Sequence, residues 1–150
     1  MNKKNQKIFK IYGLTLIELL LVITLVGFLA SIAIPGVTGW INRAKVKNVA
    51  YELLSDIQYV QSLALAKGES KIIFSSNSYT AEADGNTIFT KTIPSGITIS
   101  ASFTLSSNIL EFERNKLPTS NGTIEISGYG ITYKIIVSHI SGRIRMETSP

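Results

Sequence analysis

The chain has 150 residues, enough for one membrane helix and one modest domain but too few for two independent globular cores. Lys and Arg outnumber Asp and Glu by 15 to 10, but four of the lysines precede Gly13, so the rest of the chain is close to neutral and the basic excess is a topology signal. The absence of cysteine excludes disulfides, thiolate metal sites and a cysteine nucleophile.

A basic segment of residues 1–13 is followed by a long apolar segment, residues 14–34, with one ionisable side chain, Glu18. As a helix, this segment would extend about 31 Å, which matches the hydrocarbon core of a bilayer. Basic residues before such a span keep that end in the cytoplasm, so we expect the rest of the chain outside. A secretory signal peptide is the alternative, but its apolar region would be shorter and would gain nothing from a carboxylate.

Glu18 needs a partner or a function, because a carboxylate within a membrane helix costs about 2.5–3.5 kcal/mol. Cleavage after Gly13 would create an α-amino group on Leu14, one helical turn from Glu18. Between axially staggered neighbouring chains, this amine and the carboxylate would neutralise each other. Their pairing would then set the offset between neighbouring helices.

The lysine-rich leader, Gly13, residues 14–18 and the apolar run together resemble the N-terminal processing motif of type IV pilins and type II secretion pseudopilins. The resemblance implies that a prepilin peptidase cleaves between Gly13 and Leu14 and methylates the new amine. It also implies that Glu18, fifth in the mature chain, directs assembly with other pilin or pseudopilin subunits. Leu14 departs from the phenylalanine that is commonest at this position.

Pro35 lies where pilin-like helices often carry a proline that bends or locally melts the helix, because proline lacks a backbone donor and clashes with the preceding turn. The alternative is that the membrane helix simply ends there. We expect a transmembrane and assembly helix over residues 14–35 and an amphipathic helix over residues 36–68.

The second helical segment has one apolar face and a polar opposite side, and Gly68 after Lys67 supplies a stop. A coiled-coil partner could use the same face, but it covers fewer than three heptads, so packing against the head is favoured. The members of this face are Val46, Val49, Ala50, Leu53, Ile57, Val60 and Ala64.

From residue 69 onward, short β-branched and aromatic runs alternate with turn residues, which predicts a β-rich head and an α+β fold. Asp84-Gly85-Asn86 predicts a tight hairpin. Two small antiparallel sheets and one curled sheet both fit. The expected strands are residues 71–74, 78–83, 87–93, 97–103, 109–112, 122–127, 131–137 and 144–146.

The helix followed by this β-rich tail is similar to the GspH/FimT class of minor pilins, although an arginine common in the helix of that class is replaced here by Gln61. The C-terminal Gly142-Arg143-Ile144-Arg145 also resembles the Gly-Arg-x-Arg pattern of DNA-binding members of the FimT group. In a strand, alternation would place both guanidinium groups on one face with Ile144 packed inward. Two such groups could bind DNA phosphates, with Lys134 and Lys116 as possible additions, but charge protecting an edge strand is an alternative explanation.

Catalysis has little support in the sequence, which has one histidine, His139, and no pattern for a catalytic, cofactor or metal site. Glu111 and Glu113 should share one strand face, where a solvated surface explains them better than acid and base chemistry. We therefore expect no enzyme and no cofactor.

The resulting hypothesis is a structural subunit with a single membrane pass, its N-terminus in the cytoplasm and its head outside, which later joins an extracytoplasmic filament. The expected partners are the prepilin peptidase, other pilin subunits and the cytoplasmic membrane. DNA binding through Arg143 and Arg145 during natural transformation is the alternative function. The sequence leaves open a pilus, a secretion system or a competence apparatus.

Overall fold

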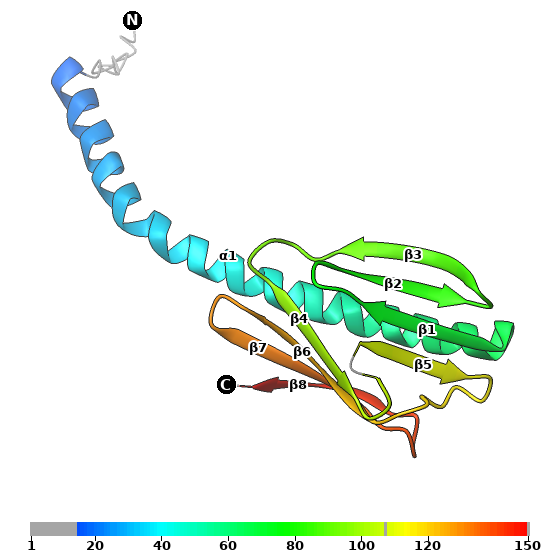
Figure 1. The fold of residues 1–150 in the computed structure, drawn as a ribbon. Helices are drawn as coiled ribbons and strands as arrows, with labels where there is room; N and C mark the ends of the chain where they lie inside the picture. Colours follow the sequence, from blue (N-terminus) through cyan, green and yellow to red (C-terminus); the bar gives the residue numbers. More distant parts are fainter. Residues whose placement is uncertain (1–14, 107, 150) are drawn as a thin grey trace, which may run out of the picture. The chain divides into compact units, whose positions relative to one another are not determined.

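The computed structural model describes residues 15–106 and 108–149 and contains one long helix followed by eight strands (Figure 1). Helix α1 covers Leu16–Lys67 and ends before Gly68, as predicted. The expected α+β fold is confirmed. The strands are β1 (Glu69–Phe74), β2 (Ser78–Ala83), β3 (Asn86–Thr92), β4 (Thr98–Phe103), β5 (Ile109–Glu113), β6 (Gly122–Gly128), β7 (Ile131–Val137) and β8 (Ile144–Ser149).

The strands form two antiparallel sheets of four strands each, so the two-sheet alternative holds. The first sheet has the order β3-β2-β1-β5 and the second β4-β6-β7-β8. All eight predicted strands are present, and the largest difference in bounds is at β8, which continues to Ser149 rather than ending at Met146. Two residues with positive φ, Asp84 (52°) and Gly85 (73°), connect β2 to β3, which is the tight hairpin that the sequence predicted.

One stripe of α1 lies in the core against the inner faces of both sheets. Every predicted member of the stripe is fully buried except Val49, which is partly buried and packs against the same core. The first sheet contributes side chains such as Ile72 and Leu110, and the second contributes Ile124 and Ile135. The apolar period of the helix therefore sets which of its faces the head covers.

The N-terminal part of α1 exposes its large apolar side chains, and its residues up to Thr38 belong to a different compact unit from residues Gly39–Pro150. Within residues 15–106 and 108–149, no helix is by itself long and apolar enough to cross a membrane. The two segments Leu16–Ile32 and Val37–Lys67 of α1 satisfy the required length and composition only when taken together.

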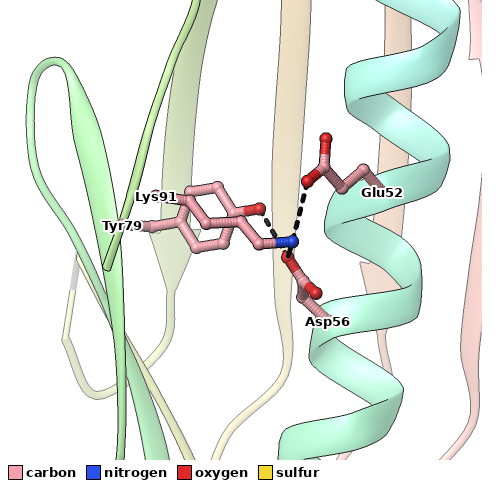
Figure 2. A network of polar contacts seen from close by, with 4 residues as sticks. All are labelled: Glu52, Asp56, Tyr79 and Lys91. Carbon is pink, nitrogen blue, oxygen red and sulfur yellow. Dashed lines mark hydrogen bonds and ion pairs between the residues drawn. The ribbon is translucent and has the colours of Figure 1, made fainter. Parts of the chain in front are cut away.

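A polar network joins α1 to the first sheet beside the core (Figure 2). The Nζ of Lys91 lies 2.7 Å from a carboxylate oxygen of Glu52 and 2.7 Å from one of Asp56. The hydroxyl of Tyr79 donates a 2.6 Å hydrogen bond to the same oxygen of Asp56. Asp56 thus accepts from two strands at once, and its side chain is only 14% exposed.

Both partners of Asp56 hold their protons more tightly in the folded chain. Burial, the hydrogen bond to Asp56 and the negative charges of Asp56 and Glu52 all raise the pKa of Tyr79 above its ordinary value. Burial lowers the pKa of Lys91, but its bonds to the two carboxylates outweigh this effect, so its pKa is also raised.

Leu53→Ala should lower the free energy of unfolding by about 2–5 kcal/mol, because it leaves a cavity under both sheets. Leu65→Ala, on the same helix but at a side chain 58% exposed, is the matched control and should change stability by at most about 0.5 kcal/mol. Denaturation of the full-length chain in neutral detergent, followed by near-ultraviolet circular dichroism, measures both. Equal effects would contradict the buried stripe.

Asp56→Ala should destabilise the head by about 1–3 kcal/mol near neutral pH, because it leaves the Tyr79 hydroxyl without its acceptor. The raised pKa values of Tyr79 and Lys91 also predict that wild-type stability is retained up to about pH 10 and falls above it. The variant should show a weaker fall. Thermal melts from pH 8 to 11 test this, with Glu82→Ala as a control that removes the partly exposed ion pair to Lys71 and costs about 1 kcal/mol or less. An identical pH dependence in wild type and Asp56→Ala would refute the role of the network.

Candidate functional site

The processing residues Gly13 and Leu14 lie outside the part of the chain that the structure describes, so their role remains a prediction. Pro35 lies within α1, which continues through it to Lys67. Its role as a bend also remains a prediction.

Glu18 takes part in a capping box at the start of α1. Its Oε2 accepts 2.8 Å hydrogen bonds from both the backbone N–H and the hydroxyl of Thr15. In return, the hydroxyl of Thr15 accepts a 3.3 Å bond from the backbone N–H of Glu18. These are the reciprocal contacts that satisfy free donors at a helix start. The carboxylate therefore has a local structural role besides any role in assembly.

Sequence reasoning missed this role, although the signal was present. A threonine followed three residues later by a glutamate, before an apolar run, is the capping-box pattern. Both bonds from Thr15 use Oε2, and no other described residue donates a hydrogen bond to Oε1. Within residues 15–106 and 108–149, one oxygen of Glu18 thus accepts no hydrogen bond.

Arg143 and Arg145 lie on the exposed side of the second sheet, at the start of its edge strand β8. Both are exposed, while Ile144 and Met146 between and beyond them pack against the core. Arg143 precedes the strand, and the loop that carries it is closed by two backbone bonds with Ser138. Gly142 has a φ of 63°, so a residue with a side chain would be strained at this turn.

The two arginines line a surface hollow of about 720 Å³ at the end of the second sheet, which we call the arginine hollow. Cross-strand pairing places Arg145 beside Ile136, which lies opposite Thr123, and Thr123 lies opposite Ser102. Hydroxyl and amide groups therefore line the same hollow as the two arginines. The polar side chains that line the hollow are Ser102, Thr104, Asn121, Thr123, Ser138, Ser141, Arg143 and Arg145.

Carboxylates partly neutralise this face. Glu147 lies two residues along the same strand from Arg145, and their side chains form a 3.2 Å ion pair in which each is 50% exposed. Lys134, which we expected as a possible addition to the patch, forms a 2.8 Å ion pair with Glu125. No described residue forms an ion pair or a side-chain hydrogen bond with the guanidinium of Arg143. Arg143 is thus the less engaged of the two arginines.

Gln61 fixes the loop that carries Arg143 to the helix. Its amide nitrogen donates 2.8 and 2.9 Å hydrogen bonds to the carbonyls of Lys116 and Gly142. The sequence singled out Gln61 only as a departure from a family pattern. In the structure it joins α1 to the β5–β6 and β7–β8 connections, which no local pattern could indicate because the three segments lie far apart in the chain.

The other ionisable residues noted in the sequence are His139, Glu111 and Glu113. The backbone N–H of His139 donates to the Oδ1 of Asn121 at 2.8 Å, and its ring Nδ1 contacts the carbonyl of Pro118. Glu111 and Glu113 share the exposed face of β5, as predicted. Lys71 lies opposite Glu111 in the neighbouring strand.

The chain is similar in sequence to known pilus and competence proteins. No family model matches the chain. The chain is 29% identical over 144 residues to the competence protein ComGD of Bacillus subtilis, covering 95% of this chain and 98% of that protein. It is 33% identical over 124 residues to the fimbrial protein EcpB of Eikenella corrodens, covering 77% of each. It is also 35% identical over 75 residues to the type IV major alpha-pilin of Moraxella bovis, covering 50% of this chain and 46% of that one.

The fold is also similar to a solved structure. The crystal structure of the type IV minor pilin FimU from Pseudomonas aeruginosa superimposes with a TM-score of 0.58 over 70% of this chain and 90% of that chain, at 19% identity. A match at this identity supports the fold, and the family follows from the sequence relatives. The chain therefore belongs to the type IV pilin-like proteins, which are structural proteins rather than enzymes.

Proposed function

We propose that the chain is a minor pilin that a prepilin peptidase cleaves after Gly13 and methylates on Leu14, and that then joins a filament through α1. The observation that carries the proposal is a single carboxylate, Glu18, in the first turn of a helix whose following side chains are apolar and exposed. Exposed apolar side chains gain free energy when lipid or neighbouring helices cover them.

The free oxygen of Glu18 gives the assembly step a specific geometry. Among the described residues only Thr15 donates to the carboxylate, and both of its bonds use Oε2, so we assign Oε1 to the α-amino group of Leu14 in a neighbouring subunit. An amine that appears only on cleavage would make processing a precondition for pairing. Because an unpaired charge in an apolar environment is costly, the paired arrangement would be strongly preferred over other offsets between helices.

Before assembly, the chain would cross the cytoplasmic membrane once through α1, with the lysine-rich leader inside and the head outside. Among the possible machines, a competence apparatus has specific support, because the similarity to ComGD extends over nearly the full length of both chains. A pilus or a type II secretion system would use the same subunit chemistry. The GspH/FimT class remains our proposed subfamily.

A second function, DNA binding, is supported by the two arginines that line one hollow on an exposed face. Guanidinium groups bind phosphate oxygens through paired hydrogen bonds, and hydroxyl groups supply further donors. Such contacts would hold the phosphate backbone without reading base sequence. The subunit would then carry DNA on the filament during uptake.

Glu18→Gln separates the role in assembly from the role in capping. Glutamine can still accept from Thr15 and donate to a neighbouring group, so the helix start should persist while the charge is lost. We expect normal membrane insertion and cleavage but at least about tenfold less of the variant in sheared filaments, by quantitative immunoblot.

Thr15→Ala is the matched control, because it removes the hydroxyl of the cap but keeps the carboxylate of Glu18. It should cost about 0.5–2 kcal/mol of helix stability and leave assembly largely intact. Normal incorporation of Glu18→Gln, or equal defects in both variants, would contradict the charge-pairing proposal.

Replacing both arginines of the hollow, Arg143→Ala with Arg145→Ala, should remove the salt-sensitive part of DNA binding by the full-length protein in neutral detergent. The slope of log affinity against log salt should fall by about one to two, because each phosphate contact contributes about 0.9. Gel shifts at 50 and 150 mM salt measure this. The control Lys71→Ala with Arg114→Ala removes two cations elsewhere on the head, and an equal loss there would refute a site at the hollow.

A further inference from the structure

The two arginines of the hollow differ in what they contact. Arg145 is held by Glu147 in a 3.2 Å ion pair, whereas no such partner of Arg143 is found in the described chain. The side chains of Arg145 and Glu147 are each half exposed, so the pair is accessible to solvent and to a ligand. A phosphate that binds Arg145 through Nη2 would therefore compete with a carboxylate that is already in place.

The other cation beside Glu147 already has a partner of its own. Lys134 lies directly opposite Glu147 in β7, but its ammonium is 2.8 Å from a carboxylate oxygen of Glu125. The cation nearest in the cross-strand register is thus already paired. The partner of Glu147 is instead Arg145. Arg145 is also the cation that a phosphate in the hollow would bind, so the carboxylate and the phosphate compete for it.

We propose that Glu147 is an affinity-determining residue of the arginine hollow, an internal competitor that occupies Arg145 and is displaced when a nucleic acid phosphate binds. This inference rests on the proposed binding of DNA at the hollow. It adds to that site an acidic residue, which lies outside the Gly142–Arg145 motif. Arg143 makes the first phosphate contact, while Arg145 contributes after its bond to Glu147 breaks. Ser141 and Thr123 line the same hollow, and their hydroxyl groups can donate hydrogen bonds to phosphate oxygens.

The arrangement has a physical consequence for binding. An exposed ion pair contributes little to stability, so Glu147 lowers affinity without abolishing binding. It acts on complexes that need Arg145, because a complex held by Arg143 alone leaves the ion pair intact. A ligand with several regularly spaced phosphates gains enough from its other contacts to displace the carboxylate, whereas an isolated anion gains less.

The test measures binding of a fluorescent 20-nucleotide single-stranded DNA to the full-length protein in neutral detergent, by anisotropy at 50 mM salt. Glu147→Gln should tighten binding about two- to fivefold, the range that corresponds to an exposed ion pair. All variants carry the same lysine-rich leader, so its contribution is a constant background.

Two controls separate a local effect from a change in net charge. Glu111→Gln removes the same charge from an exposed position on the first sheet and should leave affinity within about 1.5-fold. In an Arg145→Ala background, Glu147→Gln should change affinity by less than about 1.5-fold, because the cation it held is absent.

The outcomes distinguish this inference from the proposed DNA binding. If binding depends on Arg143 and Arg145 but Glu147→Gln has no effect, the competitor role is refuted and DNA binding stands. If Glu147→Gln tightens binding equally with and without Arg145, or no more than Glu111→Gln does, the effect is only one of net charge and the inference fails. If the wild-type protein shows no arginine-dependent binding but Glu147→Gln does, the inference is supported. If neither binds through the arginines, both proposals fail.

Discussion

The head depends on the burial of one apolar stripe of α1 against two sheets. The stripe runs from Val46 to Ala64, and its members contact the inner faces of both sheets within one core. Neither four-stranded sheet could cover its own apolar face alone, so each is stable only because the helix and the other sheet cover it. At the junction between the sheets, the rings of Phe74 and Phe103 lie 6.1 Å apart. The same helix continues toward the N-terminus with exposed apolar side chains, so its buried stripe and its exposed apolar segment belong to one element.

Polar contacts also join the helix to the two sheets. Asp56 connects α1 to β2 and β3 of the first sheet through Tyr79 and Lys91, and Gln61 connects α1 to the loops beside the second sheet. The buried hydroxyl of Ser70 donates to the carbonyl of Val60 at 2.7 Å. Each of these bonds satisfies a group that would be costly to bury without a partner, so they favour one arrangement of helix and sheets.

Local pattern predicted the elements well because the physical cause of each lies within a few residues. The helical period, the Asp84-Gly85 turn and the alternating strands follow from side-chain spacing and turn chemistry. The sequence could not decide between two sheets and one curled sheet, because strand order depends on contacts between distant segments. The same limit applied to the roles of Asp56 and Gln61. The capping box of Glu18 is different, since Thr15 stood three residues away and the pattern was available.

For the charges near the C-terminus, too, local pattern predicted some features and strand pairing decided others. Alternation correctly placed Arg143 and Arg145 on one side, with Ile144 packed inward. Strand pairing, which the sequence does not specify, decides that Lys134 is engaged by Glu125. The ion pair of Arg145 with Glu147 follows a simple spacing along one strand, but a search for basic residues alone would pass over it.

Because the 150 residues contain no cysteine, the two sheets and the helix are held together by packing, hydrogen bonds and ion pairs, without a disulfide. Formation of the head requires no oxidant and no thiol exchange, and its free energy of unfolding does not depend on the redox potential of its surroundings. The head can therefore reach and keep its fold in reducing and oxidising media alike.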